Sequence, residues 1–202
     1  MLEYTLESQL QSQGFKYVCG VDEAGRGPLC GPVVAAAVIL PTDLQIEGLN
    51  DSKKLTEKRR EKLFDIICEK AIAYSITYGT VEQINQTNIL AATLDAMHRA
   101  VDSISVYAEH ALIDGNIAKG FSIPATAVVH GDAISPSLAA ASILAKVTRD
   151  RLCIELDAEY PMYGIAKHKG YGTKEHMEAL RKYGPAPIHR TKFIRFLDEG
   201  NQ

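Results

Sequence analysis

The sequence lacks any cysteine pattern of the kind that holds zinc or builds a disulfide framework. There is no Cys-X-X-Cys pair, and four cysteines are scattered along the 202 residues. They are Cys19, Cys30, Cys68 and Cys153. Such spacing is typical of reduced, mostly buried thiols in a cytosolic protein, so we expect a cytoplasmic location and no structural zinc.

Long hydrophobic runs, internal repeats and low-complexity segments are absent as well. The longest apolar run covers residues 33–41, far fewer than the roughly 20 residues that a membrane-spanning helix needs. Residues 1–14 are polar and acidic, so we expect no secretory signal peptide. With 46% hydrophobic and 23% charged residues, the composition predicts a soluble globular chain with one domain and a C-terminal extension.

A strong net charge is also missing, since the formal net charge is −3. Taken alone, this slightly negative charge argues against a nucleic-acid ligand. The distribution of charge argues the other way. Residues 146–195 contain 11 Lys and Arg against 6 Asp and Glu, a local balance of +5, so the rest of the chain carries 11 against 19, or −8. Aromatic residues are interleaved with these basic residues, which suits a polyanion with stackable bases. A solvated basic face is the alternative.

The most informative stretch places two adjacent acids before a glycine-rich turn. Asp22 and Glu23 lie at the end of a predicted strand over residues 17–21, and successive strand residues face opposite sides. For both acids to serve one site, the strand must end near Asp22, and the glycines within 25–27 allow the chain to bend there. Arg26 and the exposed backbone amides around it then suit a phosphate or a sugar. A solvated turn with an ion pair is the alternative.

Hydrophobic periodicity predicts an alternation of strands and helices. The expected strands cover residues 17–21, 33–40, 72–80, 111–114 and 125–129, and the first two are expected to form a hairpin. The expected helices cover residues 56–71, 81–85, 88–103, 135–158, 173–184 and 189–199. Thr56, Ser135 and Thr173 are the expected N-caps. Residues 160–172 form a loop rich in Gly, Tyr, His and Lys.

Three of the predicted strands end in an acid next to glycine. Asp22 and Glu23 follow the first strand, Asp114 ends the fourth and Asp132 follows the fifth. Functional groups gather at the carboxyl ends of neighbouring strands in open α/β sheets, and hard divalent cations stabilise converging carboxylates. Because there is no ligand-type cysteine or histidine pair, the composition favours Mg²⁺ or Mn²⁺, and two such ions suit in-line displacement at a phosphodiester. His130 either helps a proton to move or is a bystander.

The longest predicted helix carries a hydroxyl and two cations on one face. Ser142, Lys146 and Arg149 follow the spacing i, i+4, i+7. This spacing suits contacts along a phosphate backbone, and solvated helix decoration is the alternative. A run of alanines on a neighbouring face lets the helix backbone pack closely against the sheet. We expect Asp150 and Arg151 to be ion-paired surface residues.

Six motifs carry a resemblance to a known family. They are Gly-Val-Asp-Glu-Ala-Gly-Arg-Gly-Pro, Asn-Asp-Ser-Lys-Lys-Leu, Asp-Gly-Asn, Gly-Asp-Ala, Ala-Ala-Ala-Ser-Ile-Leu-Ala-Lys-Val-Thr-Arg-Asp and His-Lys-Gly-Tyr-Gly-Thr. In this order, over residues 14–193, the chain resembles ribonuclease HII, the type 2 ribonuclease H family. The resemblance implies an α/β protein with an RNase H-like fold, in which helices flank a central mixed five-stranded sheet and a helical C-terminal extension covers the active-site cleft.

The same resemblance implies an activity and the residues that serve it. Such enzymes cleave the RNA strand of RNA–DNA hybrids and nick duplex DNA 5′ to a single embedded ribonucleotide, the first step of ribonucleotide excision repair. A two-metal-ion mechanism then gives 3′-hydroxyl and 5′-phosphate ends. The acids expected to be catalytic and to bind Mg²⁺ or Mn²⁺ are Asp22, Glu23, Asp114 and Asp132. The expected substrate contacts are Gly25, Arg26 and Gly27 at the 2′-hydroxyl, Tyr171 at the RNA–DNA junction, and Lys53, Ser142, Lys146 and Lys169 along the phosphates.

The resemblance also suggests how the chain is divided and what it binds. The expected parts are an N-terminal segment over residues 1–14, a catalytic core over 15–160 and a helical substrate-binding part of the same domain over 161–202. We expect a monomer that binds RNA–DNA hybrids and ribonucleotide-containing DNA, no membrane, and no sliding-clamp motif. Departures from the family pattern are His130, Ile165 and Thr191, where lysine, phenylalanine and serine are common. None of these departures removes a predicted metal ligand.

Three other functions compete with this interpretation. Ribonuclease HIII carries an extra N-terminal substrate-binding domain and lacks the Gly-Arg-Gly turn, whereas the catalytic motif here starts at Asp22. A catalytically silent hybrid-binding module would be expected if an acid had been lost, and all four acids are present. A glycosidase with a carboxylate pair explains the acids but neither the glycines nor the basic last quarter.

Overall fold

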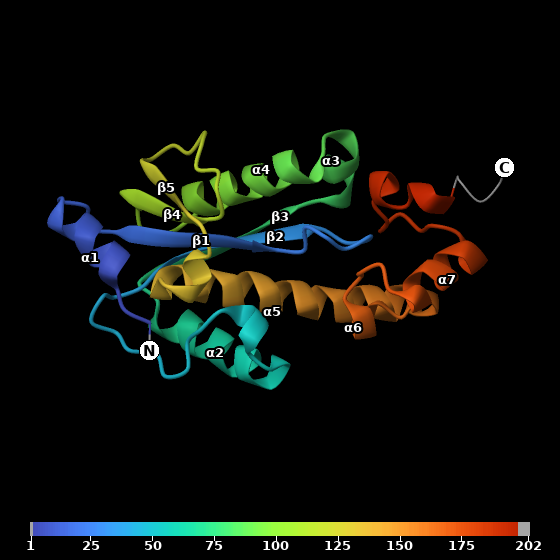
Figure 1. Ribbon diagram of the computed structural model, residues 1–202, viewed down its shortest axis with the longest axis horizontal. Coiled ribbons are helices and arrows are strands. Elements are labelled where there is room, and N and C mark those ends of the chain that lie inside the picture. Colours follow the sequence, from blue (N-terminus) through green and yellow to red (C-terminus); the bar gives the residue numbers. More distant parts are fainter. Residues whose placement is uncertain (1, 198–202) are drawn as a thin grey trace.

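A five-stranded sheet forms the centre of the computed structural model, which describes residues 2–197 (Figure 1). The strands are β1 (Val18–Ala24), β2 (Val33–Ile39), β3 (Ala73–Gly79), β4 (His110–Asp114) and β5 (Ala125–Val128). Their order is β3-β2-β1-β4-β5. β2 is antiparallel to both β1 and β3, and β4 is parallel to both β1 and β5. The predicted mixed sheet and the predicted hairpin are confirmed.

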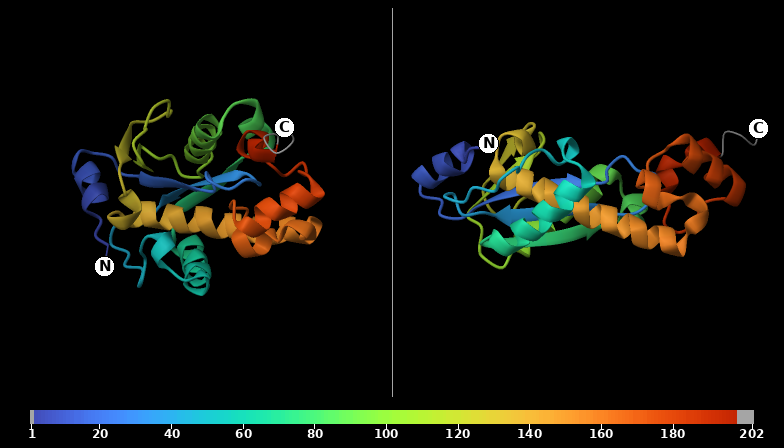
Figure 2. Two further views of the ribbon diagram at one scale, coloured as in Figure 1. Left: turned by 45° about the vertical axis from the view of Figure 1, so that its right-hand side comes forward. Right: turned by 90° about the horizontal axis from the view of Figure 1, so that it is seen from below.

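Helices cover both faces of this sheet. The α-helices of the described chain are α1 (Thr5–Ser12), α2 (Glu57–Lys70), α3 (Val81–Gln86), α4 (Ile89–Asp102), α5 (Pro136–Glu159), α6 (Ile165–His168) and α7 (Lys174–Tyr183). Figure 1 shows α3 and α4 on one side of the sheet and α2 and α5 on the other. Figure 2 shows α6 and α7 beyond one end of the sheet. In the part of the chain that the structure describes, no helix is long and apolar enough to cross a membrane.

The helix starts follow local capping chemistry. The side chains of Thr56, Ser135 and Thr173 each accept a hydrogen bond from the backbone N–H three residues further along. Each bond satisfies a donor that the first turn of a helix leaves unpaired. Pro136 lies in the first turn of α5, where no N–H is needed. All three predicted N-caps are confirmed.

The long helix α5 lies directly against β1 because Gly20 has no side chain. A Cβ on Gly20 would lie 2.3 Å from the carbonyl carbon of Ser137, so the two backbones touch at this point. The alanines 139–141 of α5 are fully buried against the sheet, as the alanine run predicts. Further along the same helix, the hydroxyl of Ser142 lies beside the carboxylate of Asp22. The close packing therefore places α5 next to the acids of β1.

Several predicted boundaries differ from the structure. β1 continues to Ala24 rather than ending near Asp22, and its last residue is still paired with Val34 of β2. Part of the segment 1–14 forms α1, which no sequence pattern indicated. Within the predicted loop 160–172, the structure has the short helix α6.

The expected helix over residues 189–199 is wrong in its described part. That part contains only the short 3-10 turns Thr191–Phe193 and Arg195–Leu197, and residues 198–199 lie outside the described residues. The backbone here pairs with the loop after β1 instead: the N–H of Arg190 donates to the carbonyl of Leu29 at 2.8 Å. This tertiary pairing uses groups that a helix would need for its own hydrogen bonds.

A separate hydrophobic cluster joins the loop after β1 to the C-terminal part of the chain. Its buried members are Leu29, Cys30, Cys153, Tyr163, Ile165, Leu180 and Ile194. The four cysteines are free thiols, three buried and one half-buried, as their spacing predicts. The C-terminal part is therefore packed against the end of α5 and the loop that follows the first acids.

Candidate active site

Four carboxylates meet at one edge of the sheet. Asp22 and Glu23 lie in β1, Asp114 is the last residue of β4, and Asp132 lies in a 3-10 turn after β5. The Oδ1 atom of Asp114 accepts a hydrogen bond from the backbone N–H of Gly131 at 2.7 Å, which ties that turn to the end of β4. Because β1, β4 and β5 are parallel neighbours, the expected convergence of the acids is confirmed.

Asp22 and Glu23 reach the same groove although they are neighbours in one strand. The groove has a volume of about 230 Å³, and both residues line it. The expectation that β1 must end near Asp22 for this to happen is wrong, since the strand continues past both acids. The predicted site residues line this groove except Asp132 and Lys169. Asp132 lies next to it, with its Oδ2 atom 3.8 Å from the Nζ atom of Lys53.

Burial and mutual repulsion raise the pKa values of these carboxyl groups. Burial raises the pKa of Asp22 well above its ordinary value, and Glu23 and Asp114 add to the effect. Burial also raises the pKa of Glu23, against the opposing effect of Arg26. The pKa of Asp132 is raised by burial and then by Asp114. A cation bound among these groups would stabilise their charged forms.

The donor atoms at this edge suit a hard divalent cation. Asp132 is only 4% exposed, and within residues 2–197 its Oδ2 atom has no hydrogen-bond partner. A buried carboxylate oxygen in this state is a ready metal ligand. The acids offer only oxygen atoms, which Mg²⁺ and Mn²⁺ prefer. The exposed His130 precedes this turn with a left-handed φ of 55°, and its part in proton movement stays a prediction.

The glycine turn and Tyr171 lie beside the acids. A Cβ on Gly27 would lie 3.4 Å from the Cε1 atom of Tyr171, so turn and ring are in contact distance. The Nη1 atom of Arg26 donates to the Oε1 atom of Glu23 at 3.3 Å. Tyr171 is 49% exposed, which leaves its ring accessible to a ligand. The residues that were expected to read an RNA–DNA junction thus share a groove with three of the four acids.

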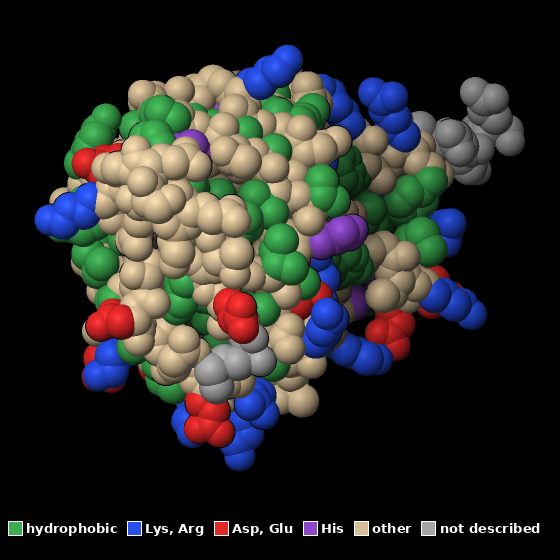
Figure 3. All heavy atoms as spheres, turned by 60° about the vertical axis from the view of Figure 1, so that its left-hand side comes forward, with side chains coloured by type: hydrophobic (Ala, Val, Ile, Leu, Met, Phe, Trp, Pro, Cys, Tyr) green, Lys and Arg blue, Asp and Glu red, His purple; other side chains and the backbone are tan. Residues whose placement is uncertain are grey.

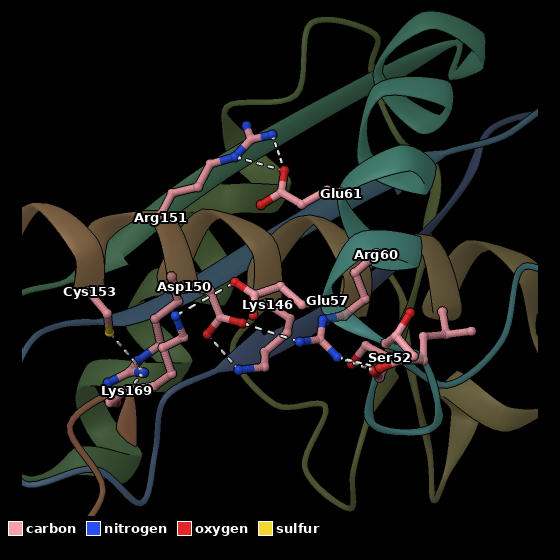
Figure 4. A network of polar contacts seen from close by, with 12 residues as sticks. Ser52, Glu57, Arg60, Glu61, Lys146, Asp150, Arg151, Cys153 and Lys169 are labelled. Atoms are coloured by element: carbon pink, nitrogen blue, oxygen red, sulfur yellow. Dashed lines mark hydrogen bonds and ion pairs between the residues drawn. The ribbon is translucent and has the colours of Figure 1, made fainter. Parts of the chain in front are cut away.

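The lysines predicted to contact phosphates differ in how they are paired. The side chain of Lys53 is 80% exposed and lies 3.8 Å from Asp132. Lys146 pairs with Asp150 at 2.5 Å, and Lys169 lies 3.7 Å from a glutamate of α2 (Figure 4). Figure 3 shows Lys and Arg side chains around the indentation between the main body and the C-terminal part. Of the three lysines, Lys53 needs the least rearrangement to meet a phosphate.

The helix face that was expected to follow a phosphate backbone is largely buried. Ser142 is 3% exposed, and its hydroxyl lies 2.8 Å from that of Ser52, so its contact with phosphate stays a prediction. Arg149 is 2% exposed and donates to the carbonyl of Lys169 at 2.9 Å. The phosphate contact expected of Arg149 is therefore wrong, because its guanidinium is enclosed by protein.

The acid that follows Arg149 in α5 is also buried, contrary to expectation. Asp150 is 3% exposed and accepts from both Lys146 and Arg60, as Figure 4 shows. The expected surface ion pair applies to Arg151, which contacts Glu61 of α2. Asp150 thus anchors α2 to α5 and holds one of the lysines at the groove.

A cluster of cysteine and histidine was missed because its members are far apart in the sequence. The possible ligand atoms of Cys30, His176 and His189 all lie within 4.8 Å of one another. The two imidazoles contact each other, Nε2 to Nε2, at 3.2 Å, and their Nδ1 atoms meet backbone groups of Tyr171 and Ala186. Because every ring nitrogen of the two histidines has a protein partner, we assign the cluster a packing role beside the backbone of Tyr171.

The chain is similar to known proteins over most of its length. The profile of the family described as Ribonuclease HII matches residues 19–196. A relative from Acetivibrio thermocellus named Ribonuclease HII is 56% identical over 189 residues, which cover 94% of this chain and 74% of the relative. The ribonuclease H2 from Pyrococcus horikoshii OT3 matches with a TM-score of 0.75 and 29% identity, over 91% of this chain and 98% of that chain. Bst-RNase HIII in complex with Mn²⁺ shares the fold, with a TM-score of 0.66 and 21% identity over 90% of this chain and 64% of that chain.

Proposed function

Because the chain belongs to the ribonuclease HII family, and is therefore a ribonuclease H acting on RNA–DNA substrates, we propose that it nicks duplex DNA 5′ to a single embedded ribonucleotide. We further propose that it cleaves RNA in longer hybrids, leaves 3′-hydroxyl and 5′-phosphate ends, and works as a monomer in the cytoplasm. The free state of all four cysteines supports the proposed location.

One juxtaposition carries this proposal: three of the four acids, the Gly-Arg-Gly turn and Tyr171 share one groove, and Asp132 lies next to it. The acids alone would support hydrolysis of any phosphodiester. The neighbouring turn has no side chain on Gly27, so a sugar edge can approach its backbone there closely. Tyr171 faces that turn at contact distance. A site of this kind can cleave and, in the same place, distinguish ribose from deoxyribose.

We propose that the four acids, Asp22, Glu23, Asp114 and Asp132, hold two divalent cations, Mg²⁺ or Mn²⁺. Such ions supply an activated water and stabilise the leaving oxygen. The chain's own part is to fix the carboxylates. The N–H of Glu23 donates to the Oδ1 atom of Asp22 at 2.7 Å, and the N–H of Gly131 donates to Asp114. These short contacts fix the direction of two carboxylates before any ligand arrives.

Substrate binding is proposed for the part of the chain after residue 160 together with the rim of the groove. Lys53, Lys146 and Lys169 lie at or beside this rim and are our candidates for the phosphates. The 2′-hydroxyl is recognised by backbone groups of residues 25–27, and the ring of Tyr171 presses on the next sugar. Each contact acts on the nucleic-acid backbone, so cleavage is expected to be independent of base sequence.

A labelled DNA duplex with one internal ribonucleotide tests the proposal. It is incubated with the protein and Mg²⁺, Mn²⁺ or EDTA, beside an all-DNA duplex and a long RNA–DNA hybrid. We expect a metal-dependent nick 5′ to the ribonucleotide and no cut in the all-DNA duplex. Cleavage of the long hybrid alone would reject the proposed junction preference but leave the ribonuclease H activity. Tight binding without any cleavage would show a silent binding module.

The Arg26→Ala variant should lower kcat/KM on the single-ribonucleotide duplex by about 10- to 100-fold, the value of one charge-assisted hydrogen bond. Arg26 is half-exposed at the groove and contacts Glu23, so its loss removes a cation beside the reacting phosphate without removing an acid. Steady-state kinetics measure the effect. The control is Arg151→Ala, which removes an arginine that pairs with Glu61 away from the groove. Parental kinetics of Arg26→Ala would reject a substrate role for this side chain.

The Tyr171→Ala variant should lose its preference for the single-ribonucleotide duplex more than it loses cleavage of a long hybrid. The ring contacts the sugar at the junction, so we expect the ratio of single-ribonucleotide to long-hybrid cleavage to fall about tenfold, the value of one aromatic contact with a nucleotide. Rates on both substrates are measured with the same preparation. The control is Tyr107→Ala, which removes a tyrosine that is 73% exposed and does not line the groove. An unchanged ratio for Tyr171→Ala would remove Tyr171 from junction recognition.

A further inference from the structure

Arg190 is a fully buried arginine that binds backbone carbonyls instead of an acid. Its exposure is 0%, and within residues 2–197 it has no ion pair. Its Nη2 atom donates to Gly25 at 2.7 Å, its Nη1 atom to Arg26 at 2.9 Å and Pro28 at 2.8 Å, and its Nε atom to Gly31 at 2.9 Å. One guanidinium therefore fixes four carbonyl groups of the loop that contains the Gly-Arg-Gly turn.

These bonds decide which way the amide groups of the turn point. No peptide bond in the described chain is cis, so each N–H points opposite to the C=O of its own peptide unit. The carbonyls of Gly25 and Arg26 point at Arg190, and the N–H groups of Arg26 and Gly27 therefore point away from it. Among the described residues, neither N–H has a hydrogen-bond partner. Two free donors are left on a turn that lines the groove.

The Pro28–Leu29 peptide of the same loop shows this arrangement with both partners visible. The carbonyl of Pro28 accepts from Arg190, and the N–H of Leu29 donates in the opposite direction to the carbonyl of Gly170 at 2.8 Å. Gly170 immediately precedes Tyr171 in the chain. Arg190 thus helps to set the loop against the segment that carries the tyrosine.

Arg149, a second buried arginine, packs against the same loop. A Cβ on Gly25 would lie 2.0 Å from the Nε atom of Arg149, so the arginine side chain fills the space that a larger residue would need. Its Nη1 atom donates to the carbonyl of Lys169 at 2.9 Å, and its Nη2 atom donates to the carbonyl of Cys30 at 3.3 Å. Arg149 therefore connects the glycine turn to the segment before Tyr171, while Arg190 holds the carbonyls of the turn itself.

We propose that Arg190, supported by Arg149, is a positioning residue for junction recognition, which it serves by turning the N–H groups of Arg26 and Gly27 toward the substrate. This inference rests on the proposed function, because it assigns a purpose to the direction of those two donors. Arg190 touches no substrate atom. It acts through the loop backbone, and its fork of fixed donors is what a lysine cannot reproduce.

The test compares Arg190→Lys with the parent on two substrates. Lysine keeps the charge but cannot reach four carbonyls at once, so the loop loses its fixed orientation. We expect the ratio of kcat/KM for the single-ribonucleotide duplex to that for a long hybrid to fall about tenfold, the value of one hydrogen bond to the 2′-hydroxyl. The control for lost stability is Ile67→Val, a change in the core on the far side of α5, which should lower the melting temperature and leave the ratio unchanged.

A second measurement does not require the variant to fold. Residue-resolved hydrogen exchange on the Asp22→Asn protein should show the amides of Arg26 and Gly27 protected by the single-ribonucleotide duplex and not by the all-DNA duplex. An Arg190→Lys protein with the parental substrate ratio, or no substrate-dependent protection of the two amides, would overturn the inference. If the parent protein does not nick at the ribonucleotide, the proposed function itself is rejected. This outcome differs from one in which the parent nicks and only the role of Arg190 is rejected.

Discussion

The Asp22→Asn variant is expected to lower kcat by about 10³-fold or more, while the fold and hybrid binding stay intact. Asparagine has the shape of aspartate, and its side-chain oxygen can still accept the N–H of Glu23, which lies 2.7 Å from Asp22 Oδ1. The amide is neutral, however, and is a weaker ligand than a carboxylate for a hard divalent cation. Several kcal/mol of transition-state stabilisation depend on such ions. Single-turnover cleavage of the labelled duplex in Mg²⁺ measures the loss.

The same substitution should raise the melting temperature in EDTA at neutral pH. The pKa of Asp22 is raised in the folded protein, first by burial and then by Glu23 and Asp114. A carboxyl group of this kind stabilises the fold below its unfolded-state pKa of about 4, and that stabilisation is lost as the pH rises through the folded-state pKa. Asparagine stays neutral throughout. The difference between variant and parent should therefore grow from acidic to neutral pH, and Mg²⁺ should stabilise the parent more than the variant.

A matched control separates the lost ligand from the lost charge. Asp95→Asn removes an acid that is exposed on α4 and pairs with Arg99, and this acid does not line the groove. Its cleavage rate and its response to Mg²⁺ should equal those of the parent. Turnover by Asp22→Asn at a parental rate would exclude Asp22 from the proposed metal site and, with it, the grouping of the four acids.

The convergence of the acids could be predicted because its signals are local. Asp114 ends a short apolar strand and is followed by glycine, and Asp132 follows glycine after the next strand. Parallel strands bring their carboxyl ends to one edge of a sheet. The acids therefore meet when β1, β4 and β5 are neighbours in the sheet. The N-caps were predictable for the same reason, since a cap such as Ser135 bonds to an amide three residues away. The comparisons establish the family, while the metal role of each acid stays a proposal.

The roles of the arginines could not be predicted, because they depend on distant segments. Arg149 follows Lys146 by three positions in α5 and both line the groove, yet the Arg149 side chain is buried while that of Lys146 stays partly exposed. What covers Arg149 is the turn after β1 together with the residues before Tyr171. No periodicity within α5 contains that information. The expected helix over residues 189–199 was wrong for a related reason, since the chain near Arg190 pairs with the loop after β1.

The second large effect is expected at Gly20, where the Gly20→Ala variant should lose about 3 kcal/mol of stability or more. The added Cβ would lie 2.3 Å from the carbonyl carbon of Ser137 and 2.4 Å from the N atom of Leu138. Both contacts are backbone atoms of the first turn of α5, so no side chain can rotate away. Overpacking of this kind usually costs about 1–3 kcal/mol and more where the backbone itself must shift. In a chain of this size the melting temperature should fall by roughly 10 °C.

Gly172→Ala is the matched control, because a Cβ there would meet its nearest neighbour, a side-chain atom of Leu29, at an ordinary 3.4 Å. It should melt within a few degrees of the parent. Since α5 also holds Ser142 against Asp22, the displaced helix in Gly20→Ala should lower cleavage of both substrates equally, with their ratio unchanged. A loss of stability with parental activity would mean that α5 shifts without moving Ser142. A parental melting temperature would contradict the direct contact between α5 and β1 on which the placement of the site depends.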